Sequence, residues 1–436
     1  MRVYVDRLTP RVHYAVELIL RELLLAEEVR ITDDWNKFEQ YEGPRLIYGR
    51  KQIEGVPSIY NVELLYEKDI YEQEISVQRG ENEVPYFFST GGQSAMPFDV
   101  FAASFYLVSR YEEYLPHISD AHDRFPAEES LAFKHDFLQV PVVDHWALQL
   151  KSILLEADTR WDFGDRAYKY IPTIDVDNLY AYKGKGGFRT LGGFAKDFYQ
   201  FNFLNAFNRF RSLIGIKKDP YDTFEFQREL FLEHGLTAKY FILFSEFGEF
   251  DRNLPMYSRR LHESVRAFND FFDVGIHPSY GSHQGQRRLE KEIRGLEEAL
   301  RSPVRESRQH FLKLKMPGTF RQLVDLGITD DYTMGYASEL GFRAGTCTPF
   351  KFYDLEMETT LPLKMHPFVM MDGTLIYYQN VSAADAWEHI APLIDQVKAV
   401  NGELITVWHN RIFSESEPEW EGWNAILKRI INHAKA

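Results

Sequence analysis

The sequence predicts an α/β protein with two domains, a smaller α/β domain at residues 1–160 and a larger domain at residues 169–436. The chain has 436 residues, which is longer than one ordinary hydrophobic core accommodates and favours two domains. From residue 169 onward, short apolar runs alternate with amphipathic helical patterns, which indicates a parallel sheet, open or closed into a barrel. The polar, turn-rich segment 158–168 ("DTRWDFGDRAY") separates the two regions, so we place the boundary there.

The first domain is predicted to mix helices with short strands. Apolar residues recur at helical spacing in residues 11–29 and 99–115. Residues 44–49 and 60–66 are typical of strands between these helices. A third helix is predicted to run to about Ala157, with Asp144 as its N-cap.

The second domain is predicted to alternate strands with helices. The predicted strands are residues 170–176, 238–244, 272–277, 303–310, 342–347 and 403–410. The predicted helices are residues 224–234, 258–271, 286–300 and 383–400. Chemistry in such folds gathers at the carboxyl ends of the strands, so we expect the functional residues there.

Composition excludes several classes of function. The hydrophobic fraction of 44% and charged fraction of 26% are typical of a soluble globular protein. The net charge of −15 disfavours nucleic acid, whose phosphates need Lys and Arg, and also disfavours an anionic membrane surface. No apolar run reaches the roughly 18 residues of a spanning helix, and the N-terminus shows no signal peptide. With a single cysteine, Cys347, the chain is expected in a reducing compartment, the cytoplasm.

Two aspartates end the first strand of the second domain, in "IPTIDVDNLY" at residues 171–180. Side chains at i and i+2 of a strand share a face, so Asp175 and Asp177 are expected to lie close together. Two carboxylates at that distance raise one pKa or require a cation. The alternative is that both aspartates serve an Asx turn or cap a helix.

Three other predicted strands end in histidine or arginine. His277 ends one strand, Arg308 and His310 end the next, and His409 ends the last. Imidazole and carboxylate together suit Zn²⁺ and its first-row neighbours, so Asp177 with two histidines would make a three-ligand catalytic site. Asp175 and His409 are then the candidates for the base and the acid.

These motifs resemble those of the polysaccharide deacetylase family, the NodB-homology or carbohydrate esterase 4 group. "TIDVD" departs by one inserted residue from the usual T-F-D-D, and "GIHPSYGSH", "SRQH" and "TVWHN" follow in the family's order. The resemblance implies a distorted (β/α) barrel over residues 169–436. It also implies a divalent metal, with Zn²⁺ the first choice and Co²⁺ or Ni²⁺ as alternatives.

The resemblance further implies the roles of individual residues. Asp175 would be the base, held by Arg308, and His409 would protonate the leaving group. Asp177 and His277 would bind the metal. The third ligand is open between His283 and His310, because the spacing from His277 to His283 is longer than the family's.

The implied function is metal-dependent hydrolysis of an N-acyl group, such as acetyl, from a sugar or glycan precursor. "AASFYLVSRYEEYL" and "YTMGYASELGFRAGTCTPFKFYDLE" resemble a subgroup with an added N-terminal domain of unknown role, associated with bacterial surface glycans. Two alternatives remain: a glycan-binding or scaffold protein that has lost its metal, and a metal hydrolase of another non-peptide C–N or ester bond. The oligomeric state is left open.

Several conspicuous residues are predicted to be structural rather than functional. For His283, the alternative to binding the metal is a position in a solvated loop. His366 is expected to be structural. Cys347 is expected to be a small buried side chain. The segment 183–193, "KGKGGFRTLGG", is predicted to be a flexible loop over the rim of the site.

Overall fold

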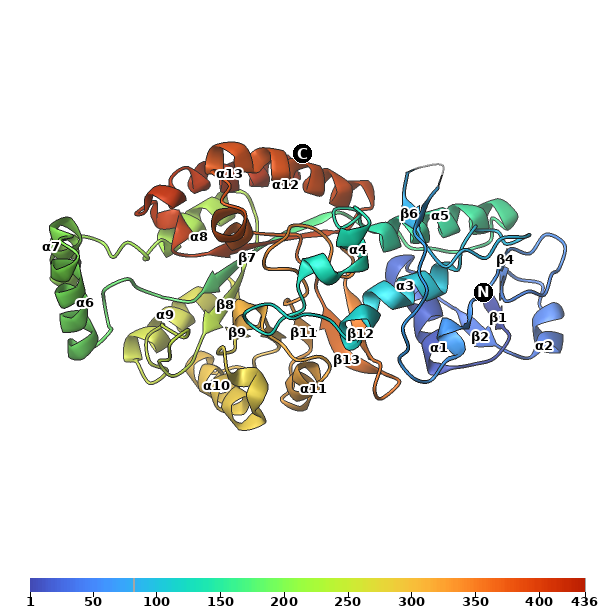
Figure 1. Cartoon of the computed structure of the whole chain (residues 1–436), viewed down its shortest axis with the longest axis horizontal. Coiled ribbons are helices and arrows are strands. Elements are labelled where there is room, and N and C mark those ends of the chain that lie inside the picture. The colour runs from blue at the N-terminus through green and yellow to red at the C-terminus, as the bar shows by residue number, and fades with distance from the viewer. Residues whose placement is uncertain (81–82, 436) are drawn as a thin grey trace.

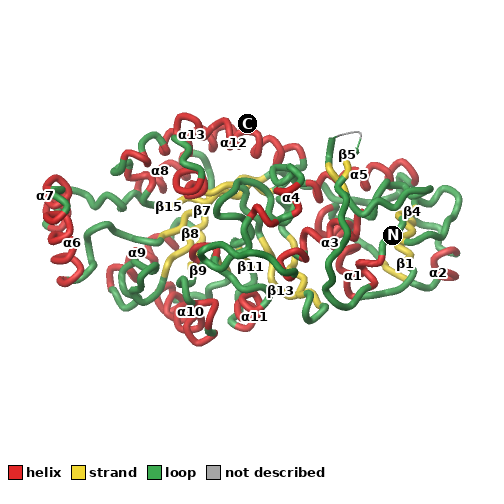
Figure 2. Tube along the Cα trace, viewed as in Figure 1, coloured by secondary structure: helices red, strands yellow, loops and turns green. Residues whose placement is uncertain are grey.

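The computed structural model describes residues 1–80 and 83–435, which form an elongated α/β molecule with two main sheets (Figure 1). The smaller sheet lies near one end of the long axis and the larger sheet in the middle. The helices α6 and α7 stand at the opposite end, and Figure 2 shows that loops connect them to the rest of the molecule.

The smaller sheet is parallel and has the strand order β2-β1-β3-β4. Its strands are β1 (Arg2–Val5), β2 (Arg30–Thr32), β3 (Arg45–Tyr48) and β4 (Ser58–Ile59). The helices in this part of the chain are α1 (Pro10–Glu17), α2 (Trp35–Glu39), α3 (Val100–Val108), α4 (Leu131–Lys134) and α5 (Val142–Ala157). A two-stranded ribbon pairs β5 (Gln78–Arg79) with β6 (Pro85–Tyr86).

The larger sheet has nine strands in the order β12-β13-β11-β10-β9-β8-β7-β15-β14. The strands are β7 (Lys169–Val176), β8 (Lys239–Leu243), β9 (Asp273–His277), β10 (Glu306–Ser307), β11 (Asp330–Asp331), β12 (Phe350–Asp354), β13 (Thr359–Met365), β14 (Met370–Met371) and β15 (Glu403–His409). All pairs are parallel except β12 with β13. The predicted mixed α/β architecture is therefore confirmed. Among the described residues, however, no ladder joins β12 to β14, so the closed barrel is not shown.

Helices cover both sides of the larger sheet. They are α8 (Phe224–Glu233), α9 (Arg259–Asn269), α10 (Gln286–Leu300), α11 (Gly318–Asp325), α12 (Ala383–Ala399) and α13 (Trp423–Lys435), whereas α6 (Gly187–Tyr199) and α7 (Phe203–Leu213) stand apart from the sheet. Figure 1 places α8, α12 and α13 along one side and α9, α10 and α11 along the other. No helix in residues 1–80 or 83–435 is long and apolar enough to cross a membrane.

Some predicted elements are wrong for identifiable reasons. Residues 342–347 form turns rather than a strand, because Gly345 has φ +67° and its carbonyl accepts a hydrogen bond from Val143 N. The strand predicted at residues 303–310 shortens to β10, since the chain turns where Phe311 has φ +58°.

Three local predictions in other parts of the chain also fail. The strand predicted at residues 60–66 is a 3₁₀ turn over Glu63–Tyr66. The helix α5 begins at Val142, so Asp144 lies in its first turn instead of capping it, and its carboxylate binds Arg166 at 2.7 Å. The predicted loop at residues 183–193 contains the start of α6.

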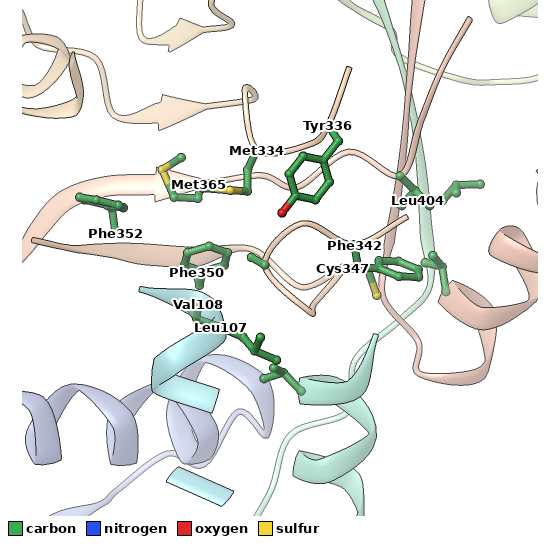
Figure 3. Packing of buried hydrophobic residues seen from close by; sticks show 14 of the residues in the cluster. Leu107, Val108, Met334, Tyr336, Phe342, Cys347, Phe350, Phe352, Met365 and Leu404 are labelled. Atoms are coloured by element: carbon green, nitrogen blue, oxygen red, sulfur yellow. The ribbon is translucent and has the colours of Figure 1, made fainter. Parts of the chain in front are cut away.

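The hydrophobic core runs across the predicted domain boundary. Leu107 and Val108 of α3 belong to the same buried cluster as Phe350 of β12 and Met365 of β13 (Figure 3). Cys347 is buried in this cluster too. The division into residues 1–160 and 169–436 therefore stays a prediction, because the first part packs extensively against the second.

Candidate metal centre

The two aspartates lie at the carboxyl end of the central strand β7. This strand is bounded on both sides by parallel partners, β8 and β15, and its apolar residues Ile174 and Val176 are fully buried. Asp175 and Asp177 are only 2% and 7% exposed. The sheet register aligns Asp175 with His409 on β15, so the carboxyl ends of neighbouring strands meet at one edge, as the sequence predicted.

Asp177, His277 and His310 form a group of potential metal ligands. One donor atom of each lies within 4.8 Å of the others. The Nε2 atoms of His277 and His310 are 3.4 Å and 3.7 Å from Asp177 Oδ1. Two imidazoles and one carboxylate are a donor set typical of catalytic zinc sites.

The other ring nitrogen of each histidine is already engaged. Nδ1 of His277 lies 2.5 Å from the carbonyl oxygen of Arg308, and Nδ1 of His310 lies 2.9 Å from Asp251 Oδ1. A carbonyl can only accept, so Nδ1 of His277 carries the proton and its Nε2 keeps the lone pair. Partners of this kind fix the orientation of metal-binding histidines in many proteins.

The surroundings of Asp177 Oδ1 show whether these residues fit a cation. This oxygen is buried and has no hydrogen-bond partner among the described residues, although two imidazole nitrogens face it. Buried carboxylate oxygens are normally paired, by donors or by a metal. The donor set therefore fits a divalent ion.

The second oxygen of Asp177 faces positive charge. Arg411 Nη1 donates to Oδ2 at 2.6 Å, and His409 Nε2 lies 3.6 Å from it. Burial raises the pKa of Asp177, but the neighbouring His409 and Arg411 outweigh burial and hold this pKa well below its usual range. Asp177 is therefore ionised and available as a ligand.

Asp175 is held by a buried arginine. Arg308 Nη1 donates to Asp175 Oδ1 at 2.9 Å and to Thr173 Oγ1 at 2.7 Å, while Nε donates to the carbonyl of Tyr332. The guanidinium also lies over the ring of Phe241, 4.6 Å from its centroid. The opposite oxygen, Asp175 Oδ2, lies 3.9 Å from His277 Nε2, so it faces the candidate ligands.

His409 is coupled to Asp372, which the sequence analysis did not identify. Asp372 is fully buried, and its carboxylate accepts from His409 Nδ1 at 2.6 Å and from His409 N at 2.7 Å. Burial lowers the pKa of His409, but the attraction of Asp372 prevails and raises this pKa above the ordinary value for histidine. The protonated imidazole is thus favoured.

His283 and His366 lie outside the ligand group. His283 lies in a 3₁₀ turn, Ser282–Gln284. Its Nδ1 is 3.0 Å from the carbonyl oxygen of Tyr280 in the same loop. The sequence left the third member of the ligand group open between His283 and His310, and the structure places His310 beside Asp177 and His277. His366 forms ion pairs, with Nε2 2.9 Å from Asp330 and Nδ1 3.5 Å from Glu403.

A cavity of about 300 Å³ opens onto the candidate metal centre. Besides Asp175 and Asp177 it is lined by aromatic side chains, including Phe311, and by Arg124. Arg124 comes from the N-terminal part of the chain. Its guanidinium donates to Asp120, to the carbonyl of Phe311 and to the hydroxyl of Tyr378. The N-terminal part of the chain therefore contributes to the wall of the cavity.

Four residues of the site were missed by the sequence analysis: Asp251, Asp372, Arg411 and Arg124. Asp372 directly follows the short strand β14, so the strand-end rule would have identified it if that strand had been recognised. Arg411 follows His409 by two residues. Asp251 and Arg124 lie in loops, and no local pattern marks them.

Comparison with known proteins gives weak similarities. Residues 1–159 match the model of a family of unknown function, DUF7033, and no curated protein matches the chain. A solved Mycobacterium smegmatis structure, provisionally described as a polysaccharide deacetylase, is 14% identical with a TM-score of 0.41, covering 63% of this chain and 86% of its own. Puue allantoinase is 12% identical with a TM-score of 0.38, covering 62% of this chain and 84% of its own.

A CE4 family pseudoenzyme from Bacillus anthracis is also similar, at 12% identity and a TM-score of 0.30, covering 61% of each chain. The similar structures thus include polysaccharide deacetylases and CE4 family members, the group whose motifs this sequence resembles. All three TM-scores are below 0.5, so these similarities carry no argument about the chemistry of this chain.

Proposed function

We propose that this chain is a metal-dependent hydrolase that removes an N-acyl group, in the first place acetyl, from a sugar or glycan precursor. The observation that carries this proposal is the buried Oδ1 of Asp177, which has no hydrogen-bond partner in residues 1–80 and 83–435 and faces the Nε2 atoms of two histidines whose Nδ1 atoms are engaged. Asp177, His277 and His310 would hold the ion, with Zn²⁺ the first choice for this donor set. When bound, the ion would supply Lewis acidity to the acyl carbonyl and to the attacking water.

Asp175 is the proposed general base. Arg308, which also donates to Thr173, fixes the orientation of its carboxylate, and the oxygen that Arg308 does not contact is directed toward the ligand group. That oxygen can take a proton from a water beside Asp177. The charge-assisted bond to Arg308 holds the Asp175 carboxylate in this position.

His409 is the proposed general acid. It lies on the other side of Asp177 from His277, and Asp372 keeps Nδ1 occupied and favours the charged ring. Its Nε2 proton is then available to a departing amine, which must be protonated before it leaves. An amine leaving group needs this donor more than an alcohol does, which favours N-acyl over O-acyl substrates.

The cavity is suited to a sugar. It holds about 300 Å³ and combines ring faces with hydrogen-bonding groups, including the guanidinium of Arg124 and the hydroxyls of Tyr377 and Tyr378. Aromatic faces pack against the C–H faces of a pyranose, while the polar groups bind its hydroxyls. These residues are the proposed substrate contacts.

Metal loading tests the proposal. The purified chain is stripped with a chelator, reloaded with Zn²⁺, Co²⁺ or Ni²⁺, and assayed for bound metal and for acetate released from N-acetylated sugars. We expect one ion per chain and metal-dependent acetate release. Asp175→Asn should keep the metal and lose turnover, whereas Asp270→Asn, at an exposed helix end, should change neither.

Three other outcomes would contradict the proposal. A chain that binds glycan but no metal would be a binding or scaffold protein. A chain that binds metal but hydrolyses only cyclic amides or O-acyl sugars would belong to another class of hydrolase. Acetate release that persists in the chelated protein would exclude the metal's role.

A further inference from the structure

The hairpin formed by α6 and α7, residues 183–218, has its apolar face on the outside. Only three residues of the two helices are buried, and two of these, Asp197 and Ser212, are polar. Large apolar side chains point to solvent instead, with Phe188 95% and Phe207 56% exposed. The exposed set is Phe188, Leu191, Phe198, Tyr199, Phe201, Phe203, Leu204, Phe207, Phe210, Ile214 and Ile216.

The inner face of the α6–α7 hairpin is held by polar contacts. Asp197 accepts from Arg209 and Asn205, both at 2.7 Å, which joins the two helices. Arg189 donates to the carbonyls of Arg252 and Asn253 and stacks over Phe247. A helix on a globular protein normally turns its apolar stripe toward the core, so this arrangement is reversed. The exposed stripe requires a partner.

The α6–α7 hairpin is also strongly basic. Residues 183–218 contain eight Lys or Arg and one acidic residue, Asp197, in a chain whose net charge is −15. Six of the cations have no carboxylate within 4.0 Å in the described part of the chain: Lys183, Lys185, Arg189, Lys196, Arg211 and Lys217. Burial and the neighbouring Arg189 lower the pKa of Lys185 to about 8. The hairpin thus carries uncompensated positive charge.

A basic cavity lies beneath the α6–α7 hairpin. It has a volume of about 640 Å³, and seven of its lining residues are Lys or Arg while two are Glu. Asn178, which follows Asp177 directly, lines this cavity, so the basic region continues to the rim of the candidate metal centre. Figure 1 shows the hairpin at the end of the molecule away from the smaller sheet.

We propose that the α6–α7 hairpin is a membrane-docking surface that lies in the interface of a bilayer containing anionic lipids. Amphipathic helices with Phe, Tyr and Leu on one face and Lys and Arg flanking it bind in this way, with the apolar face among the acyl chains and the cations at the headgroups. The overall charge of −15 disfavours such a surface for the molecule as a whole. Electrostatic attraction decays within about 10 Å at moderate salt. The local positive charge of the hairpin, and not the net charge of the chain, therefore determines whether the hairpin is attracted to an anionic bilayer.

A second copy of the chain is the main competing occupant, and the charges disfavour it. The single acidic side chain of the hairpin, Asp197, is buried and already pairs with Arg209. Two hairpins facing each other would therefore bring together cations with no available carboxylate, at an unfavourable energy. Lipid phosphates provide the missing negative charge.

Vesicle flotation of the full chain tests this surface. Wild-type protein should bind vesicles of a roughly 3:1 mixture of phosphatidylcholine and phosphatidylglycerol at least tenfold more strongly than phosphatidylcholine alone, and binding should weaken as salt rises. Phe198→Ser with Phe207→Ser should reduce binding at least tenfold, and Lys196→Glu about fivefold or more. Matched controls are Leu232→Ser on α8 and Arg287→Glu on α10, which should bind as the wild type does.

Several results would overturn the proposal. They are absence of binding to the anionic vesicles, equal binding of hairpin and control variants, and a wild-type dimer that the hairpin variants dissociate without any vesicle binding. Circular dichroism melting confirms that each variant is folded, and the lipid and salt dependence of the wild type tests the surface without any variant. Vesicle binding requires no turnover, so this test is independent of the proposed hydrolase activity.

Discussion

The candidate metal centre and the α6–α7 hairpin differ in how their side chains are held. In the metal centre each functional residue has a fixed partner: Arg308 for Asp175, Asp251 for His310 and Asp372 for His409. In the hairpin the inner polar residues have such partners, whereas the outer Phe and Leu side chains contact solvent. The first region holds its polar side chains in one geometry, as the proposed metal site requires, and the second presents a broad apolar surface to solvent.

The comparison indicates that two properties of the side chains, their exposure to solvent and their hydrogen-bond partners, together show what kind of ligand a region can bind. Asp177 Oδ1 is buried and has no hydrogen-bond partner within the described part of the chain, which costs free energy that one bound ion can offset. An exposed apolar stripe costs less free energy per residue, but only an extended apolar partner, such as a bilayer or another protein surface, can cover it. Four substitutions test the two descriptions and a fifth tests His366, which lies in neither region; they follow in order of decreasing expected effect.

Asp177→Asn should have the largest effect. Replacing the carboxylate removes the charge that the metal would require and leaves Arg411 without its partner. We expect loss of bound Zn²⁺ and a decrease in acetate release of about 10³-fold or more. Metal analysis and kinetics measure both. Retained metal with unchanged turnover would show that the aspartate pair only ends a strand.

Asp372→Asn should have the next largest effect, without loss of metal. The amide cannot stabilise a charged His409, so we expect kcat to fall about 10²-fold while KM and bound metal change little. The separation of kcat from KM distinguishes a role in proton transfer from a general structural role. An equal decrease of metal content would instead make Asp372 part of the metal site.

Asp251→Asn should weaken metal binding and leave the chemistry in place. Its carboxylate accepts from His310 Nδ1 at 2.9 Å and from Tyr280 N, and so fixes the ring of His310. Loss of such a partner typically lowers metal affinity about 10- to 100-fold. A competition titration with a fluorescent zinc chelator gives the affinity, and saturating Zn²⁺ should restore turnover. Unchanged affinity would remove His310 from the ligand set.

His366→Gln tests a histidine that is an ion-pair partner rather than a ligand. Burial lowers the pKa of His366, but Asp330 and Glu403 prevail and raise it above 6.5. A raised folded-state pKa means that the stabilisation is complete below the unfolded value near 6.5 and is lost as pH rises through the folded-state pKa. The variant should therefore lose roughly 1–2 kcal/mol at pH 6 and less at pH 9. Urea unfolding at both pH values measures this, and a pH-independent loss would contradict it.

Phe207→Ala should have the smallest effect on stability. Phe207 of α7 is 56% exposed, whereas Phe231 of α8 is fully buried. We expect Phe207→Ala to change the free energy of unfolding by about 0.5 kcal/mol or less, and Phe231→Ala to cost about 3–5 kcal/mol. Thermal unfolding of both variants gives the comparison. A large loss for Phe207→Ala would mean that the outer face of the hairpin belongs to the core.

Much of the site could be predicted from the sequence because it depends on strand ends. His277 and His409 are the last residues of their strands and Asp175 is the last but one of β7, and parallel strands bring their carboxyl ends to one edge. Asp251 and Arg124 could not be predicted, because their loops reach the site only through long-range packing. Residues 342–347 have the composition of a strand, yet hydrogen bonding to the start of α5 holds them in turns.

The sequence by itself determined the alternation of strands and helices, the aspartate pair at the end of β7 and the types of side chain on which the proposed chemistry depends. The tertiary structure decided that His310 joins Asp177 and His277, that Asp372 supports His409, and that the apolar stripes of α6 and α7 face outward. The physical reason is the distance along the chain over which each property is decided. Side-chain periodicity and strand ends are local properties, whereas the direction in which a face points depends on every element packed around it.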